Sequence, residues 1–147
     1  MRTLMIALVL GAGLTAAACD EKLSKLAGPT PGLEPTFASV QAQIFESTDS
    51  AGRRACVICH TNVGRTPSGG LNLAHEVAYD QIVNVASARK PGATRVVPGD
   101  PENSYVIHKV EGRSSIVGAQ MPTGGPYLTD GQILILKRWI AIGAPRN

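Results

Sequence analysis

The chain has 147 residues, enough for one domain of ordinary size together with a segment that is removed or serves as a tether. Aromatic residues make up only 4% of it, against 16 glycines and 10 prolines, so we expect a small core and many loops. The net charge of +3 is mild, and no cluster of lysines and arginines is dense enough to indicate a nucleic-acid-binding protein.

Residues 1–18 have the features of a secretory signal peptide. A short basic start precedes an apolar run over residues 4–14, which is too short and wrongly flanked for a transmembrane helix. Ala16-x-Ala18 fits ordinary signal peptidase, whereas a small-residue run ending at Cys19 resembles the bacterial lipobox, with Ala16 where leucine is usual. Lipidation of Cys19 is favoured, because this cysteine is not used by the motif described below. We therefore expect a protein anchored by lipid on the periplasmic side of a bacterial membrane, the alternative being a soluble periplasmic protein.

Residues 19–35 are predicted to be a flexible linker between this anchor and a folded domain over residues 36–147. The linker is rich in proline and glycine and has little apolar periodicity. If largely extended, it would reach roughly 50 Å, at about 3.1 Å for each residue.

The first predicted helix starts at Thr36, a suitable N-cap, and ends near Glu46. Its apolar residues recur on one helical face: Phe37, Val40, Ile44 and Phe45. A polar loop over residues 47–55 follows.

Cys56-Val57-Ile58-Cys59-His60 is a C-x-x-C-H run, which is the attachment signature of a c-type haem. Each cysteine sulfur would bond one vinyl group of the porphyrin, and a ring nitrogen of His60 would bind the iron from the proximal side. A thioredoxin-like site would need a surrounding βαβ pattern, and a zinc site would need more ligands at matched spacing. The remaining histidines, His75 and His108, do not supply that spacing.

Two further helices are predicted in the middle of the chain, over about residues 71–85 and 100–112. The second of these has Asp100 at its N-cap and Pro101 in its first turn, and it ends by Gly112. Pro67 lies in the turn-rich stretch after the haem motif, where a backbone carbonyl is expected to fix the second ring nitrogen of His60.

Met121 is the predicted distal ligand of the iron. It lies in a loop rich in glycine and proline, and the other methionines belong to the signal peptide. A His/Met pair raises the reduction potential, and a filled sixth position favours electron transfer over ligand chemistry. His75 and His108 are the rival ligands, and Met121 could instead simply fill a gap in the core.

The last predicted helix starts with a Thr129-x-x-Gln132 capping box and ends at Gly143, before Pro145. Its buried stripe is Ile133, Leu136, Trp139 and Ile140. Together the four helices predict an all-α fold in which the N- and C-terminal helices cross beside the covalently attached haem.

The pattern resembles the class I cytochrome c fold and is similar, more closely, to short planctomycete-type cytochrome c domains. The resemblance implies a monohaem domain with His/Met ligation. One departure is the loop over residues 47–55, which is longer and more polar than the link in many class I members. The matching segments, spread over about residues 36–145, are 37–45, 56–60, 70–73, 97–101, 104–105, 121–122 and 139–144.

These observations predict a tethered carrier of single electrons between periplasmic redox proteins, and not an enzyme. Arg54, Arg65 and Arg113 are candidates for the exposed haem edge. The alternatives are a haem domain with a labile sixth ligand that senses or transforms a gas or peroxide, and a fixed electron-transfer subunit of a larger respiratory or photosynthetic complex.

Overall fold

The computed structural model describes residues 32–147. The predicted signal peptide, Cys19 and most of the predicted linker lie outside the described residues. The last residues of that linker, 32–35, pack on the domain, because Leu33 is buried in the core and the carbonyl of Gly32 accepts a hydrogen bond from the Gln43 side chain at 2.7 Å.

The described residues form helices and contain no β-strand, so the expected all-α class is confirmed at this coarse level. A few isolated β-bridges between residues 83 and 104 tie loops together. No helix in residues 32–147 has the length and apolar character needed to span a bilayer. The elements in chain order are α2 (Phe37–Val40), η1 (Gln41–Phe45), η2 (Cys56–Ile58), η3 (Ser68–Gly70), α3 (Ala78–Ile82), α4 (Tyr105–Glu111) and α5 (Asp130–Ala141).

The first predicted helix is confirmed as two directly joined segments, α2 and η1. Thr36 is the N-cap, and its side chain accepts from the backbone of Ser39 at 3.2 Å. The second half, η1, is a π-helix, closed by the bond from the Glu46 N–H to the Gln41 carbonyl at 3.0 Å. Since the last carbonyls of a helix have no partner within it, those near the end of η1 are free to accept from side chains.

The last helix, α5, is confirmed together with its capping box. The Thr129 hydroxyl accepts from the Gln132 N–H at 3.2 Å, and the Gln132 side chain accepts from the Thr129 N–H at 2.9 Å. Gly143 follows with a φ of 100°. The helix buries Leu136, Trp139 and Ile140.

The two middle helices are shorter than predicted. Residues 71–74 are irregular and residues 75–77 form a turn, because the Leu73 N–H donates to the His60 carbonyl and the Asn72 side chain accepts from Ala74, so α3 begins only at Ala78. Residues 100–104 also form a turn, in which the Asp100 side chain accepts from Asn103 at 3.1 Å, and α4 begins at Tyr105. In both places, backbone groups that would form helical hydrogen bonds bind other partners instead.

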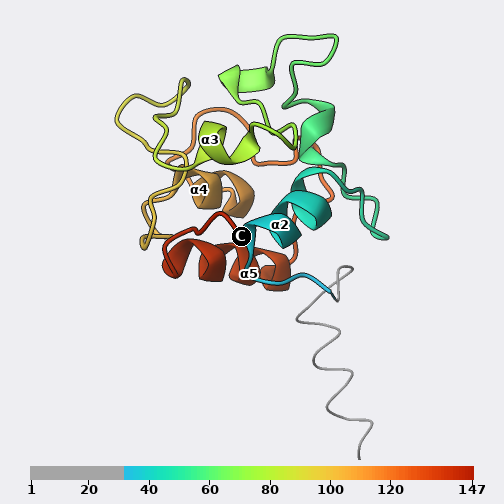
Figure 1. Ribbon diagram of the computed structural model, residues 1–147. Helices are drawn as coiled ribbons and strands as arrows, with labels where there is room; N and C mark the ends of the chain where they lie inside the picture. Colours follow the sequence, from blue (N-terminus) through green and yellow to red (C-terminus); the bar gives the residue numbers. More distant parts are fainter. Residues whose placement is uncertain (1–31) are drawn as a thin grey trace, which may run out of the picture.

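The two ends of the domain meet on one side of the core. The Phe37 ring lies 5.6 Å from the Trp139 ring, and the C-terminal residue Asn147 accepts hydrogen bonds from Phe37 and Ala38. Figure 1 shows the C-terminus next to α2, with α5 below it and α4 above. The C-x-x-C-H run, residues 56–60, follows the loop that leaves η1 and begins with η2.

Candidate functional site

The loop over residues 47–55, which delivers Cys56, is built around the buried guanidinium of Arg53. The Arg53 side chain has 0% exposure, and each of its five N–H groups has an acceptor. Three of the acceptors are backbone carbonyls at or beside the C-terminal end of η1. The acceptors are Asp49 Oδ2 (3.0 Å) and the carbonyls of Ile44 (3.0 Å), Arg54 (3.3 Å), Gln43 (3.0 Å) and Ser47 (3.2 Å).

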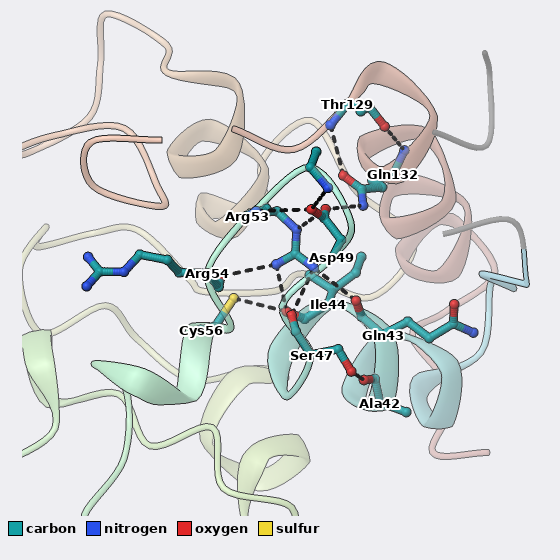
Figure 2. A network of polar contacts seen from close by, with 11 residues as sticks. Ala42, Gln43, Ile44, Ser47, Asp49, Arg53, Arg54, Cys56, Thr129 and Gln132 are labelled. Atoms are coloured by element: carbon teal, nitrogen blue, oxygen red, sulfur yellow. Dashed lines mark hydrogen bonds and ion pairs between the residues drawn. The ribbon is translucent and has the colours of Figure 1, made fainter. Parts of the chain in front are cut away.

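Asp49 completes this group of contacts, which we call the Arg53 network (Arg53, Asp49, Gln132 and the groups they bind). Its carboxylate accepts from the backbone of Ala51 and Arg53 and from the side chain of Arg53, each at 3.0 Å. It also accepts from the Gln132 side chain at 3.2 Å. Figure 2 shows the network lying between η1, the loop and the start of α5. The polar loop is thus fastened to both terminal helices immediately before the haem motif.

The ionisation of Asp49 makes this network sensitive to pH. Burial opposes the ionisation, but hydrogen bonds from Arg53 and Gln132, together with the Arg53 charge, outweigh it and lower the pKa of the carboxyl. A carboxyl with a lower pKa in the folded chain contributes stability above its unfolded pKa. That contribution is lost as the pH falls through the folded pKa.

We therefore expect Asp49→Asn to destabilise the protein most near neutral pH, with the difference from the native chain shrinking below about pH 4. Urea unfolding followed by circular dichroism over a pH series measures this difference. Glu76→Gln is the control, because Glu76 is exposed and forms no ion pair within residues 32–147. A difference for Asp49→Asn that stays constant into strong acid would contradict the assigned role.

The two cysteines of the motif are held by a single tight turn, η2. The N–H groups of Cys59 and His60 both donate to the Cys56 carbonyl, at 3.2 and 2.9 Å. The cysteines form no disulfide. Burial raises the pKa of the Cys56 thiol to about 11, and its Sγ lies 3.5 Å from the Ile44 carbonyl. A catalytic or redox-active thiol needs a lowered pKa, so this environment argues against thioredoxin-like chemistry.

His60 has one ring nitrogen fixed by the backbone. Its Nδ1 lies 2.9 Å from the carbonyl of Ser68, the residue after the predicted Pro67. Burial lowers the pKa of His60, with a smaller opposing effect from that carbonyl, which favours the neutral imidazole. A neutral ring that donates from Nδ1 presents Nε2 as the metal-binding atom.

The motif opens into a cavity of about 470 Å³, within the range of cofactor pockets. Cys56, Cys59, His60 and Met121 all line it, although Met121 is more than sixty positions away along the chain. Most of the wall is apolar, and none of the described acidic residues lines it. Its main apolar residues are Ile44, Phe45, Leu71, Leu73, Ile82, Val106, Val110, Leu128 and Leu136.

Arg95 is a buried cation on the cavity wall. It is 8% exposed, and it donates to the carbonyls of Gln81 (2.6 Å) and Gly70 (2.9 Å). Arg54, Arg89 and Lys109 line the same cavity, and none of the four forms an ion pair within residues 32–147. A buried charge without a counter-charge is costly, so the cavity suits a large apolar group that also carries carboxylates.

Haem fits this donor set. It offers an apolar ring for the wall, vinyl groups for Cys56 and Cys59, iron for His60 and Met121, and two propionate carboxylates for the cationic residues. Of the three arginines predicted for the haem edge, only Arg54 lines the cavity. Arg113 instead pairs with Glu102 and Glu111. Arg53 and Arg95 were not predicted, and the sequence offers no signal that distinguishes a buried arginine from a solvated one.

Met121 reaches the cavity from the loop before α5 and is half-buried. The Thr123 hydroxyl lies 3.5 Å from its sulfur. The rival ligands do not line the cavity: His75 is 70% exposed and contacts Glu46 at 3.3 Å, while His108 Nε2 contacts the Glu102 carbonyl at 2.6 Å. Among the candidate distal ligands, Met121 is therefore the one that lines the cavity together with His60.

Over residues 32–147, no three or more histidine, cysteine, aspartate or glutamate side chains gather in a group that could hold a metal ion. Comparison of the chain with protein-family models, with curated proteins and with solved structures finds no match.

Proposed function

We propose that the protein is a monohaem c-type cytochrome with a class I-like fold, tethered to the periplasmic side of a bacterial membrane, which carries single electrons between redox proteins. One observation carries the proposal. The two cysteines, the histidine and the methionine expected to hold the haem all line one apolar cavity. A protein of this kind is a carrier and not an enzyme in itself.

Haem, when bound, supplies an iron that takes up and gives back one electron. Cys56 and Cys59 hold the ring covalently through their sulfurs. His60 would bind the iron through Nε2, with the Ser68 carbonyl fixing the imidazole through Nδ1. Met121 would supply its thioether as a second ligand, and the mostly apolar wall would limit the access of water to the bound group. Arg95, on the cavity wall, would be available to pair with a carboxylate of the ring.

The proposed location depends on the signal peptide and on lipidation of Cys19. The donor and the acceptor are redox proteins that approach the exposed edge of the cavity. A fixed subunit of a larger complex would instead keep a stoichiometric partner after mild detergent extraction.

Met121→Ala is expected to convert a closed haem site into an open one. In the native holoprotein the reduced haem should bind carbon monoxide slowly, because Met121 must first leave the iron. In the variant, binding should be faster by at least about tenfold, and the sulfur-to-iron(III) charge-transfer band should disappear. Stopped-flow mixing and optical spectra of the oxidised and reduced forms measure both effects.

His75→Ala is the matched control, because His75 is exposed and does not line the cavity. It should leave the spectrum and the rate unchanged. Fast carbon monoxide binding by the native protein, with no change in Met121→Ala, would overturn the electron-carrier proposal. It would favour a sensor or an enzyme with a labile sixth ligand.

A further inference from the structure

The loop that carries Met121 folds back along α4 and is bound to it. After α4 the chain reverses at Gly112, which has a φ of 70°, and we call residues 113–121 the strap. The strap's contacts with α4 are hydrogen bonds to both ends of the helix. They join Val117 N to Tyr105 Oη (2.9 Å), Gln120 Nε2 to the Val110 carbonyl (2.8 Å), Met121 N to the Lys109 carbonyl (2.8 Å), and Lys109 Nζ to the carbonyls of Val117 (3.0 Å) and Ala119 (2.5 Å).

Lys109 differs from the other residues of this set because it holds the strap at three points. Its carbonyl accepts from Met121 itself, and its ammonium binds the carbonyls two and four positions before Met121. The residue is half-buried, lines the cavity and has no carboxylate partner among the described residues. Hydrogen bonds from a charged donor are shorter and stronger than neutral ones. The Lys109 ammonium therefore binds backbone carbonyls of the strap close to Met121.

We propose that Lys109 is the positioning residue of Met121 and sets how often the thioether leaves the iron. This inference rests on the proposed function, since it assigns Lys109 to the same haem site. A strap held by the ammonium keeps the sulfur preorganised at the cavity. Without the ammonium, the carbonyls of Val117 and Ala119 turn to water and the strap opens more often. In this role Lys109 acts on Met121 through the strap and not as a ligand of the iron.

The test compares three holoprotein variants, each of which removes one positive charge. Lys109→Leu removes the clamp without adding a possible iron ligand. Lys90→Leu removes a lysine that binds the strap at the Ser115 carbonyl (2.6 Å), six positions before Met121. Arg138→Leu removes a charge from the exposed face of α5. The readouts are the carbon monoxide binding rate of the reduced protein, the sulfur-to-iron charge-transfer band of the oxidised protein, and the melting temperature.

We expect Lys109→Leu to bind carbon monoxide about tenfold faster, equivalent to about 1.4 kcal/mol in the opening equilibrium, and to lose part of the charge-transfer band. Lys90→Leu should change the rate much less, and Arg138→Leu not at all. Lys109→Arg, which keeps a charged donor for both carbonyls, should restore most of the native behaviour. If Lys109→Leu does not yield folded protein, Lys109→Gln supplies the same comparison with a neutral donor.

The outcomes separate this inference from the function on which it rests. If the native protein has no charge-transfer band that depends on Met121, the proposed function is wrong, and Lys109 then has no iron-bound thioether to position. A native protein that has the band, with Lys109→Leu keeping both band and rate, overturns the role of Lys109 alone. Equal losses of melting temperature in Lys109→Leu and Lys90→Leu, without a selective change in rate, would also overturn it, because they indicate a merely structural contact.

Discussion

Arg53→Ala is expected to lower the free energy of unfolding by about 3–5 kcal/mol, because it leaves the buried Asp49 carboxylate without its cation. The same change removes the donors from four backbone carbonyls, including those of Ile44 and Ser47. Leaving buried acceptors unpaired adds to the cost. Since small domains are stable by only about 5–15 kcal/mol, the variant is close to the limit of folding. Urea unfolding of the holoprotein, followed by circular dichroism, measures the effect.

Arg138→Ala is the matched control, because it removes an arginine that is exposed, does not line the cavity and forms no ion pair within residues 32–147. It should change stability by no more than about 0.5 kcal/mol. Arg53→Lys should recover part of the loss, since lysine keeps the charge next to Asp49 but has three donors where arginine has five. Equal stabilities of Arg53→Ala and Arg138→Ala would show that the Arg53 network does not hold the loop.

The terminal helices could be predicted from the sequence because their signals are local. The capping box of α5 depends on two side chains three positions apart, and both of its bonds are present. Thr36 likewise caps α2 through a side chain within the same turn. Such signals do not require knowledge of the rest of the fold. The apolar stripe of each helix also predicted which of its faces packs on the core.

The middle helices could not be delimited in this way, because distant partners compete for their backbone groups. Leu73 donates to His60 rather than to a preceding helical turn, and Val96 donates to the Ile82 carbonyl at 3.0 Å. Asp100 forms a local turn with Asn103 instead of capping a helix. Apolar periodicity is present in both stretches, but it does not reveal which groups the backbone will bind.

The residues of the candidate site could likewise be predicted where their sequence signal is local, and not where their role depends on distant segments. The spacing of Cys56, Cys59 and His60 is local, and the turn η2 realises it. Met121 was predicted from its loop, and it does line the cavity with them. The roles of Arg53 and Arg95 depend on burial by segments far along the chain, which a single sequence does not encode in any short pattern. The long polar loop over residues 47–55 is the segment that Arg53 organises.

The cavity itself indicates that the domain depends on what fills it. Its wall is mostly apolar, so an empty cavity leaves apolar surface in contact with water, which costs free energy. We therefore expect the chain stripped of haem to lose cooperative unfolding. Trp139, the one tryptophan and fully buried, reports the loss through near-ultraviolet circular dichroism.

Replacing both motif cysteines, Cys56→Ala with Cys59→Ala, is expected to abolish covalent haem attachment. In a host that matures c-type cytochromes, extraction with acidified butanone should remove haem from the double variant and leave it on the native chain. Each single variant keeps one thioether and should retain haem, whereas Cys19→Ala, the matched control, should retain it as the native chain does. Haem that stays on the double variant, or that leaves Cys19→Ala, would contradict the assignment.

Because His60 and Met121 remain in the double variant, any haem it binds before extraction reports on those two ligands alone. The comparison thus separates attachment by the cysteines from ligation by the histidine and the methionine.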